Sequence, residues 1–221
     1  MTTGLVLASN SPRRRELFTL GGWAFRVQAV EVNEQTLPDE APAEYVLRLA
    51  QSKAQAAAGT LEAETVVVAA DTTVADGEHI LGKPRHASEA IAMLRRLRGR
   101  THRVYTALAV LRPKDGLLLT DLCATDVPMR AYSEEEIAAY VASGDPLDKA
   151  GAYAIQSRTF HPALALSGCY ANVMGLPLCH LGRLLRRAGL ANDSHPAALP
   201  AACQAALDYT CDVYPQIWGS Q

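Results

Sequence analysis

The 221-residue chain has ordinary globular proportions, with 49% hydrophobic and 20% charged residues, so it can bury a core. Its formal net charge of −2 at pH 7 gives no overall basic field, which argues against nucleic-acid binding. The five cysteines form no CxxC pair, a pattern that predicts reduced thiols in a cytoplasmic protein rather than a disulfide framework. We expect neither a signal peptide nor a membrane span, because no apolar run approaches 18 residues.

Strands and helices alternate along the predicted chain. We expect strands at 4–8, within 24–32, at 65–70, 103–112, 117–130 and near 169–174. Helices are expected at 12–20, 42–58, 88–98, from 134 to about 143 and from 177 to about 189. A loop over 75–86 with a short extended piece follows the third strand. Because one hairpin interrupts the alternation, the predicted fold class is α/β with a mixed sheet.

The turn between the first strand and the first helix carries charges of the unexpected sign. One of the polar residues at 9–11 can cap the helix, and Pro12 suits its first position. Arg13–Arg15 then crowd the first turn, where the helix dipole disfavours each cation by about 0.3–1 kcal/mol. A bound phosphate would offset this cost. Since three consecutive positions fan over about 200°, we expect one or two arginines to face such a ligand. The alternative is that all three point to solvent.

Two lysines and an aspartate stand where a phosphate site could use them. Asp71 directly follows the apolar run 65–70, and a carboxylate there suits a metal ligand or proton acceptor. A turn or capping role for Asp71 is equally open. Lys53 shares the apolar face of the 42–58 helix, so it either extends to solvent or points into a phosphate-lined cleft. Lys83, in the string LGKP, leaves the same alternatives, and that string is not a Walker A loop.

Acidic residues gather before the second helix, at Glu31, Glu34, Asp39 and Glu40. Most are expected to be solvated loop residues. One of them joining Asp71 on Mg²⁺ would suit phosphoryl chemistry, because Mg²⁺ prefers oxygen ligands and substrate phosphates. Neither a zinc set nor a Ser–His–Asp triad is supported, since the cysteines and histidines lack ligand spacing and no serine lies in a GxSxG elbow.

Taken together, these segments resemble the Maf family of nucleoside triphosphate pyrophosphatases. The matching strings are LASNSPRRREL (7–17), NEQ (33–35), YVLRLAQSKA (45–54), VVVAADTTV (66–74), ILGKPR (80–85), GRTHRVYTALAV (99–110), SGDPLDKAGAYAIQ (143–156) and GCYANVMGLPL (168–178). The resemblance predicts a Maf-like domain over 1–190, followed by an extension over 191–221 with no recognised counterpart. It implies a two-lobed α/β fold, with an elongated mixed sheet flanked by helices and a cleft between the lobes.

The resemblance also implies an activity: hydrolysis of a nucleoside triphosphate to the monophosphate and pyrophosphate with a divalent metal, Mg²⁺ or Mn²⁺. At the matching positions, Asp71 is implied as the catalytic proton acceptor and metal-linked base, and Glu34 as a second metal ligand. The implied substrate-binding residues are Ser9, Ser11, Arg13, Arg14, Lys53, Thr72, Lys83 and Gln156. The family further implies a homodimer, and we expect no membrane or nucleic-acid partner.

Three of these positions separate branches of the family. Arg13, Thr72 and Gln156 resemble the branch that acts on dTTP and UTP. An amide such as that of Gln156 both donates and accepts, which suits the adjacent carbonyl and N–H of a uracil or thymine edge. Two alternatives stay open: the same reaction on 7-methyl-GTP or another non-standard nucleotide, and a non-catalytic nucleotide- or nucleic-acid-binding regulator that uses the same basic pocket.

Overall fold

A computed structural model describes residues 4–190 and 198–218. Its centre is a six-stranded mixed sheet, which confirms the predicted α/β class. The strand order is β2 (Phe25–Val27), β1 (Leu5–Leu7), β3 (Val66–Asp76), β5 (Thr101–Arg112) and β6 (Leu117–Pro128), with β4 (His79–Leu81) pairing on β3. The β2, β1 and β3 strands are parallel, whereas β4, β5 and β6 extend the sheet in antiparallel fashion.

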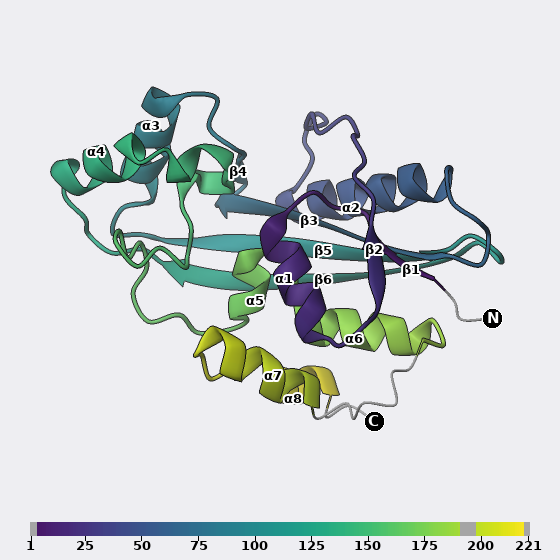
Figure 1. Cartoon of the computed structure of the whole chain (residues 1–221). Helices are drawn as coiled ribbons and strands as arrows, with labels where there is room; N and C mark the ends of the chain where they lie inside the picture. Colours follow the sequence, from purple (N-terminus) through teal and green to yellow (C-terminus); the bar gives the residue numbers. More distant parts are fainter. Residues whose placement is uncertain (1–3, 191–197, 219–221) are drawn as a thin grey trace.

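Helices gather at the two ends of this sheet and form two lobes (Figure 1). One lobe holds α1 (Pro12–Leu20), α2 (Pro42–Ala58), α5 (Tyr170–Met174) and α6 (Leu178–Arg187). The other holds α3 (Ala87–Leu97), α4 (Glu134–Ala142) and the short 3₁₀ turns η1 (Asp145–Asp148) and η2 (Ala150–Ala152). The long strands β3, β5 and β6 run through both lobes, so the sheet is the common floor. The two-lobed arrangement with an elongated sheet is therefore confirmed.

The apolar start of β3 is explained by burial on both faces. Val66, Val68 and Ala70 belong to one core cluster, which includes α1 and α6. Val67 and Ala69 belong to a second cluster, beneath α2. Because side chains alternate along a strand, a run without polar residues is what a sheet covered by helices on both sides requires.

The predicted end of this third strand is wrong. We expected a strand over 65–70, but β3 continues to Asp76 because β5 pairs with it from Val67 to Ala75. The parallel neighbour β1 stops earlier, with Leu7 opposite Val68. Asp71 therefore lies within a strand yet just beyond the carboxyl end of β1, which is where ligands bind in open α/β sheets.

The predicted strand near 169–174 is also wrong, because α5 occupies this segment. The Cys169 carbonyl accepts the backbone N–H groups of Asn172 and Val173, and Gly175 ends the helix with φ of 109°. Such a positive φ favours glycine. The other elements match the prediction closely, and α1 and α2 begin and end at the expected residues.

Part of the predicted extension is helical and packs on the first lobe. The helices are α7 (Ala198–Leu207) and α8 (Tyr214–Trp218), and both contact α6. Cys203 joins the core beside α6, with Leu199, Leu207 and Val213 packed against it. Residues 191–197 lie outside the described residues, and the boundary at residue 190 stays a prediction. Within the described parts of the chain, no helix combines the length and the apolarity that a membrane crossing requires.

Candidate active site

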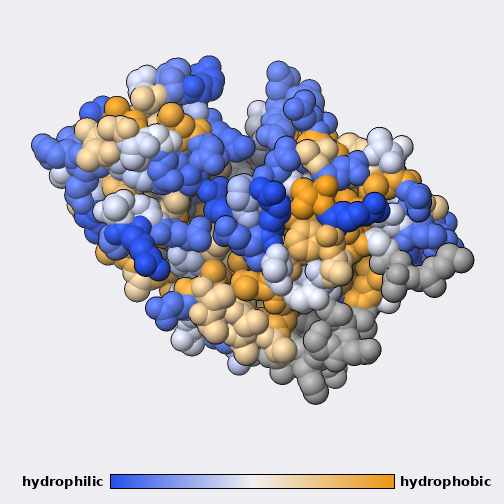
Figure 2. Space-filling model, viewed as in Figure 1, coloured by the Kyte–Doolittle hydropathy of each residue, from blue (hydrophilic) through white to orange (hydrophobic). Residues whose placement is uncertain are grey.

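A cavity of about 380 Å³ opens between the two lobes, beside the carboxyl end of β1. Figure 2 shows mainly hydrophilic surface around the notch that separates the lobes. The lining of the cavity includes nine of the predicted site residues: Ser9, Ser11, Arg13, Arg14, Glu34, Lys53, Thr72, Lys83 and Gln156. Asp71 is not itself a lining residue, but its carboxylate forms an ion pair with the lining residue Lys53. The structure thus gathers the predicted residues from six separate segments into one place.

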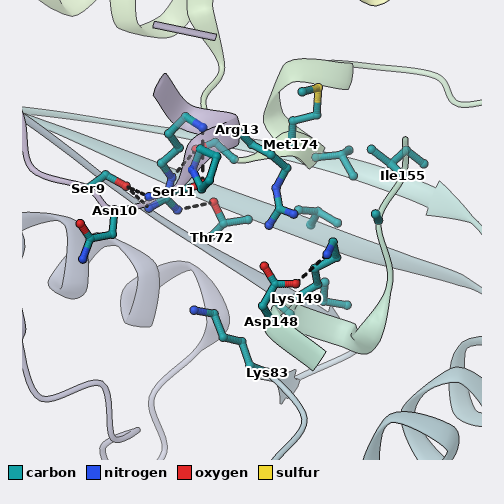
Figure 3. Close-up of a pocket in the computed structure, with 18 of the residues that line it drawn as sticks. Ser9, Asn10, Ser11, Arg13, Thr72, Lys83, Asp148, Lys149, Ile155 and Met174 are labelled. Atoms are coloured by element: carbon teal, nitrogen blue, oxygen red, sulfur yellow. Dashed lines mark hydrogen bonds and ion pairs between the residues drawn. The ribbon is translucent and has the colours of Figure 1, made fainter. Parts of the chain in front are cut away.

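The turn after β1 delivers two of the three arginines. The Ser11 hydroxyl accepts the backbone N–H of Arg14 at 3.4 Å, so the cap of α1 is the last of the three polar candidates at 9–11. The Arg13 side chain extends into the cavity (Figure 3), and Arg14 lines it as well. Arg15 is exposed and does not line the cavity. Two of the three arginines therefore line the cavity.

The guanidinium of Arg14 is held by three protein oxygens. It donates to the Gly175 carbonyl at 2.9 Å, to Thr72 Oγ1 at 3.0 Å and to Ser9 Oγ at 3.5 Å. A guanidinium carries five N–H groups, so two are left for a ligand. Arg14 is therefore a fixed, partly buried donor.

A buried ion pair forms the floor of the site. The Lys53 ammonium lies 2.6 Å from a carboxylate oxygen of Asp71 and 2.6 Å from one of Glu34. The side chains of Lys53 and Asp71 are only 12% and 9% exposed, so Lys53 points inward and the solvent alternative is wrong. A turn or capping role for Asp71 is wrong too, because the residue lies within β3.

The two carboxylates that pair with Lys53, those of Asp71 and Glu34, differ in environment. Burial raises the pKa of Asp71 above its ordinary value, although the charges of Lys53 and Arg14 oppose the effect. Burial also acts to raise the pKa of Glu34, but the hydrogen bond and charge of Lys53, with the charges of Lys83 and Arg14, outweigh it and lower that pKa. Burial thus favours the protonated form of Asp71, whereas the surrounding cations favour the ionised form of Glu34.

The loop that carries Glu34 is anchored by α2. Tyr45 donates its hydroxyl to the Glu34 carbonyl at 2.9 Å. Arg48 pairs with Glu40 and donates to the Gln35 carbonyl at 3.0 Å. Because α2 also carries Lys53, this one helix positions both the lysine and the Glu34 carboxylate with which the lysine pairs.

The acidic pair fits a divalent cation. Glu34 and Asp71 both contact the Lys53 ammonium, so a positive charge is already stabilised between them. Carboxylate oxygens are also the ligands that Mg²⁺ and Mn²⁺ prefer. Among residues 4–190 and 198–218, no group of three or more His, Cys, Asp or Glu side chains could hold a metal ion. The chain would therefore supply two ligands, Glu34 and Asp71, and leave the remaining positions to other oxygens.

The second lobe contributes the opposite wall. Lys83 follows β4, is exposed and extends toward the cavity (Figure 3). Lys149 is almost fully buried, and its ammonium is shared by Asp148 at 2.6 Å and Asp145 at 3.1 Å. Gln156 lies at the rim, exposed to solvent.

Several lining residues were not predicted individually, chiefly Asn10, Asp148, Lys149, Met174 and Gly175. All five fall within strings that carry the family resemblance, LASNSPRRREL, SGDPLDKAGAYAIQ and GCYANVMGLPL, so these strings were the available signal.

The family follows from a direct comparison. A sequence model described as "Maf-like protein" matches residues 4–188, and the chain belongs to this family of α/β proteins. Among curated relatives, dTTP/UTP pyrophosphatase of Anaeromyxobacter dehalogenans (strain 2CP-1) is 47% identical over 86% of this chain and 96% of its own length. The proteins of the same name from Geobacter sulfurreducens and Myxococcus xanthus are 46% and 48% identical, over 84% and 85% of this chain and 96% and 94% of their own lengths.

Proposed function

We propose that this protein is a nucleoside triphosphate pyrophosphatase that hydrolyses dTTP and UTP to the monophosphate and pyrophosphate. The observation that carries the proposal is the cavity itself, whose lining includes Arg13, Thr72 and Gln156 and which lies beside the buried carboxylate of Asp71. Relatives at 46–48% identity that bear the name dTTP/UTP pyrophosphatase support the same substrate class.

The charge of the cavity suits a triphosphate. Five cations lie in or against it, namely Arg13, Arg14, Lys53, Lys83 and Lys149. Four carboxylates oppose them, those of Glu34, Asp71, Asp145 and Asp148. The excess of positive charge is local, since the chain as a whole is slightly acidic. Preorganised cations of this kind stabilise the charge that develops on transferring phosphoryl groups.

Each part of the site has a distinct task in this reaction. Asp71 accepts the proton of the water that attacks the α-phosphorus, because its environment favours the protonated form. Arg13 and Lys83, which approach from opposite lobes, bind the phosphates and offset the charge of the leaving pyrophosphate. The hydroxyls of Ser9 and Ser11 add donors at the N-terminus of α1.

A divalent metal would be held by Glu34 and Asp71 and would supply further neutralisation of phosphate charge. Gln156, at the rim, is proposed to pair with the edge of the pyrimidine. We also propose a homodimer in the cytoplasm. The family resemblance supports the dimer, and the absence of a disulfide among the five cysteines, all within the described residues, suits a reducing compartment.

The test is pyrophosphate release with Mg²⁺ or Mn²⁺ across dTTP, UTP, CTP, dATP, GTP, 7-methyl-GTP and 5-methyl-UTP. Selective turnover of dTTP and UTP is expected. Turnover of 7-methyl-GTP alone would keep the reaction and overturn the base preference. Tight nucleotide binding without turnover would replace the enzyme with a nucleotide-binding regulator.

A further inference from the structure

A chain of hydrogen bonds leads from the cavity into the core. Arg14 donates to Thr72 Oγ1 at 3.0 Å, and Thr72 Oγ1 lies 2.9 Å from Thr106 Oγ1. Thr106 in turn donates to the backbone carbonyl of Asn172 at 2.9 Å. Thr72 and Thr106 are directly opposed on β3 and β5, and both Thr106 and Asn172 are fully buried.

The direction of each hydrogen bond in this series is determined by its last, buried bond, from Thr106 to Asn172. A threonine hydroxyl has one proton, and that of Thr106 is given to the Asn172 carbonyl. The short contact between the hydroxyls therefore uses the proton of Thr72, with Thr106 as acceptor. Thr72 consequently presents only lone pairs to Arg14, which is the arrangement that a guanidinium donor requires.

The inner end is itself held firmly. The Asn172 side-chain amide donates to the Val104 carbonyl at 3.1 Å and to Thr125 Oγ1 at 2.9 Å, which ties α5 to β5 and β6. Its Oδ1 atom has no hydrogen-bond partner among the described residues, a cost that a buried asparagine rarely bears. The side-chain amide of Asn172 therefore holds α5 in place, and with it the backbone carbonyl that accepts from Thr106.

Space is equally restricted around the guanidinium. A Cβ atom added to Gly175 would lie 3.2 Å from Thr72 Oγ1 and 3.4 Å from Arg14 Nε. The same glycine supplies the carbonyl that accepts from Arg14. Arg14 is thus confined by a close-packed shell whose polar members are all fixed by further bonds.

From these contacts we infer that Thr106, which does not line the cavity, is a positioning residue for Arg14. It acts through Thr72, by holding the Thr72 hydroxyl in the orientation that accepts from the guanidinium. The inference rests on the proposed function in one respect, namely that the two remaining N–H groups of Arg14 bind the triphosphate.

The test compares Thr106→Val, which removes the hydroxyl, with Thr106→Ser, which keeps it. Thr106→Ala is made alongside, so that a folded variant without the hydroxyl is available even if valine does not pack. The matched control is Thr73→Val, because Thr73 is equally buried on β3 but points to the opposite face from Thr72. Two readouts are taken: KM and kcat for dTTP, and the affinity for inorganic tripolyphosphate by calorimetry.

Loss of the Thr106 hydroxyl should raise KM and weaken tripolyphosphate binding by about tenfold, as expected for one displaced charged donor, while kcat changes little. Thr106→Ser should restore both values, and Thr73→Val should leave both unchanged. In an Arg14→Ala background the Thr106 substitution should have no further effect, because its only route to the ligand is gone.

The outcomes separate the two proposals. If the wild type hydrolyses dTTP but Thr106→Val and Thr106→Ala keep its KM and tripolyphosphate affinity, the positioning role is overturned and the enzyme stands. An equal effect with and without Arg14 also overturns it. If no nucleotide is hydrolysed but tripolyphosphate binds and weakens in the Thr106 variants as described, the positioning role stands and the proposed activity fails.

Discussion

Replacing Asp71 by asparagine should lower turnover by orders of magnitude without unfolding the protein. Asparagine keeps an oxygen that accepts from Lys53, and Lys53 stays paired with Glu34 at 2.6 Å. No buried charge is therefore left alone. The variant loses the proton acceptor and one charged oxygen of the proposed metal pair, and removal of a general base alone lowers kcat by roughly 10²–10⁴-fold.

The same substitution should stabilise the protein at alkaline pH. The folded pKa of Asp71 is raised, so its contribution to stability is present below its unfolded pKa and is lost as pH rises through the folded pKa. Each unit of raised pKa corresponds to about 1.4 kcal/mol. The difference in melting temperature between Asp71→Asn and the wild type should thus be small near pH 4 and favour the variant by a few degrees at pH 8.

The assay pairs pyrophosphate release with thermal melts at several pH values. Asp76→Asn is the matched control, because Asp76 is a carboxylate on the same strand whose pKa is lowered, chiefly by a hydrogen bond from Arg96. Asp76→Asn should keep the wild-type kcat. It should lower the melting temperature, and this loss should grow as pH rises and Asp76 of the wild type becomes ionised. An Asp71→Asn enzyme within tenfold of wild-type kcat would refute the reasoning, as would a loss of stability that grows with pH.

Three further predictions follow from the site and the core. Arg13→Ala should raise the KM for dTTP at least tenfold, whereas Arg15→Ala, on the exposed side of the turn, should leave it unchanged; equal effects would contradict the assignment of the two arginines. Gln156→Glu should reduce kcat/KM for dTTP and UTP without changing the melting temperature, since the side chain is exposed at the rim; retained pyrimidine turnover would remove Gln156 from base recognition. Burial lowers the pKa of His102 to about 4, so the wild type should lose on the order of 3 kcal/mol between pH 7 and pH 4 relative to His102→Gln in urea titrations. Parallel stability curves for the two proteins would show that this histidine does not govern the loss.

Local signals predicted the first two helices of the chain well. The α1 and α2 helices each begin at a proline and end before a glycine, and these marks are contained in the helix sequence itself. The misplaced charges of Arg13 and Arg14 likewise indicated a site, because a helix dipole acts over one turn.

Features that depend on distant partners could not be predicted in this way. The extent of β3 past Asp71 depends on pairing with β5, which begins 30 residues later. The short apolar segment of α5 is ambiguous between a strand and a buried helix on periodicity alone. Thr106 carries no local mark at all, since its role depends on Asn172, 66 residues away.

The helices of the extension have a consequence for assembly. The α7 helix lies against α1, α5 and α6, and its Cys203 is buried in their core (Figure 1). A surface of the first lobe is thereby covered by the chain itself and is closed to any second molecule. The homodimer proposed above would therefore form through surfaces that α7 leaves free.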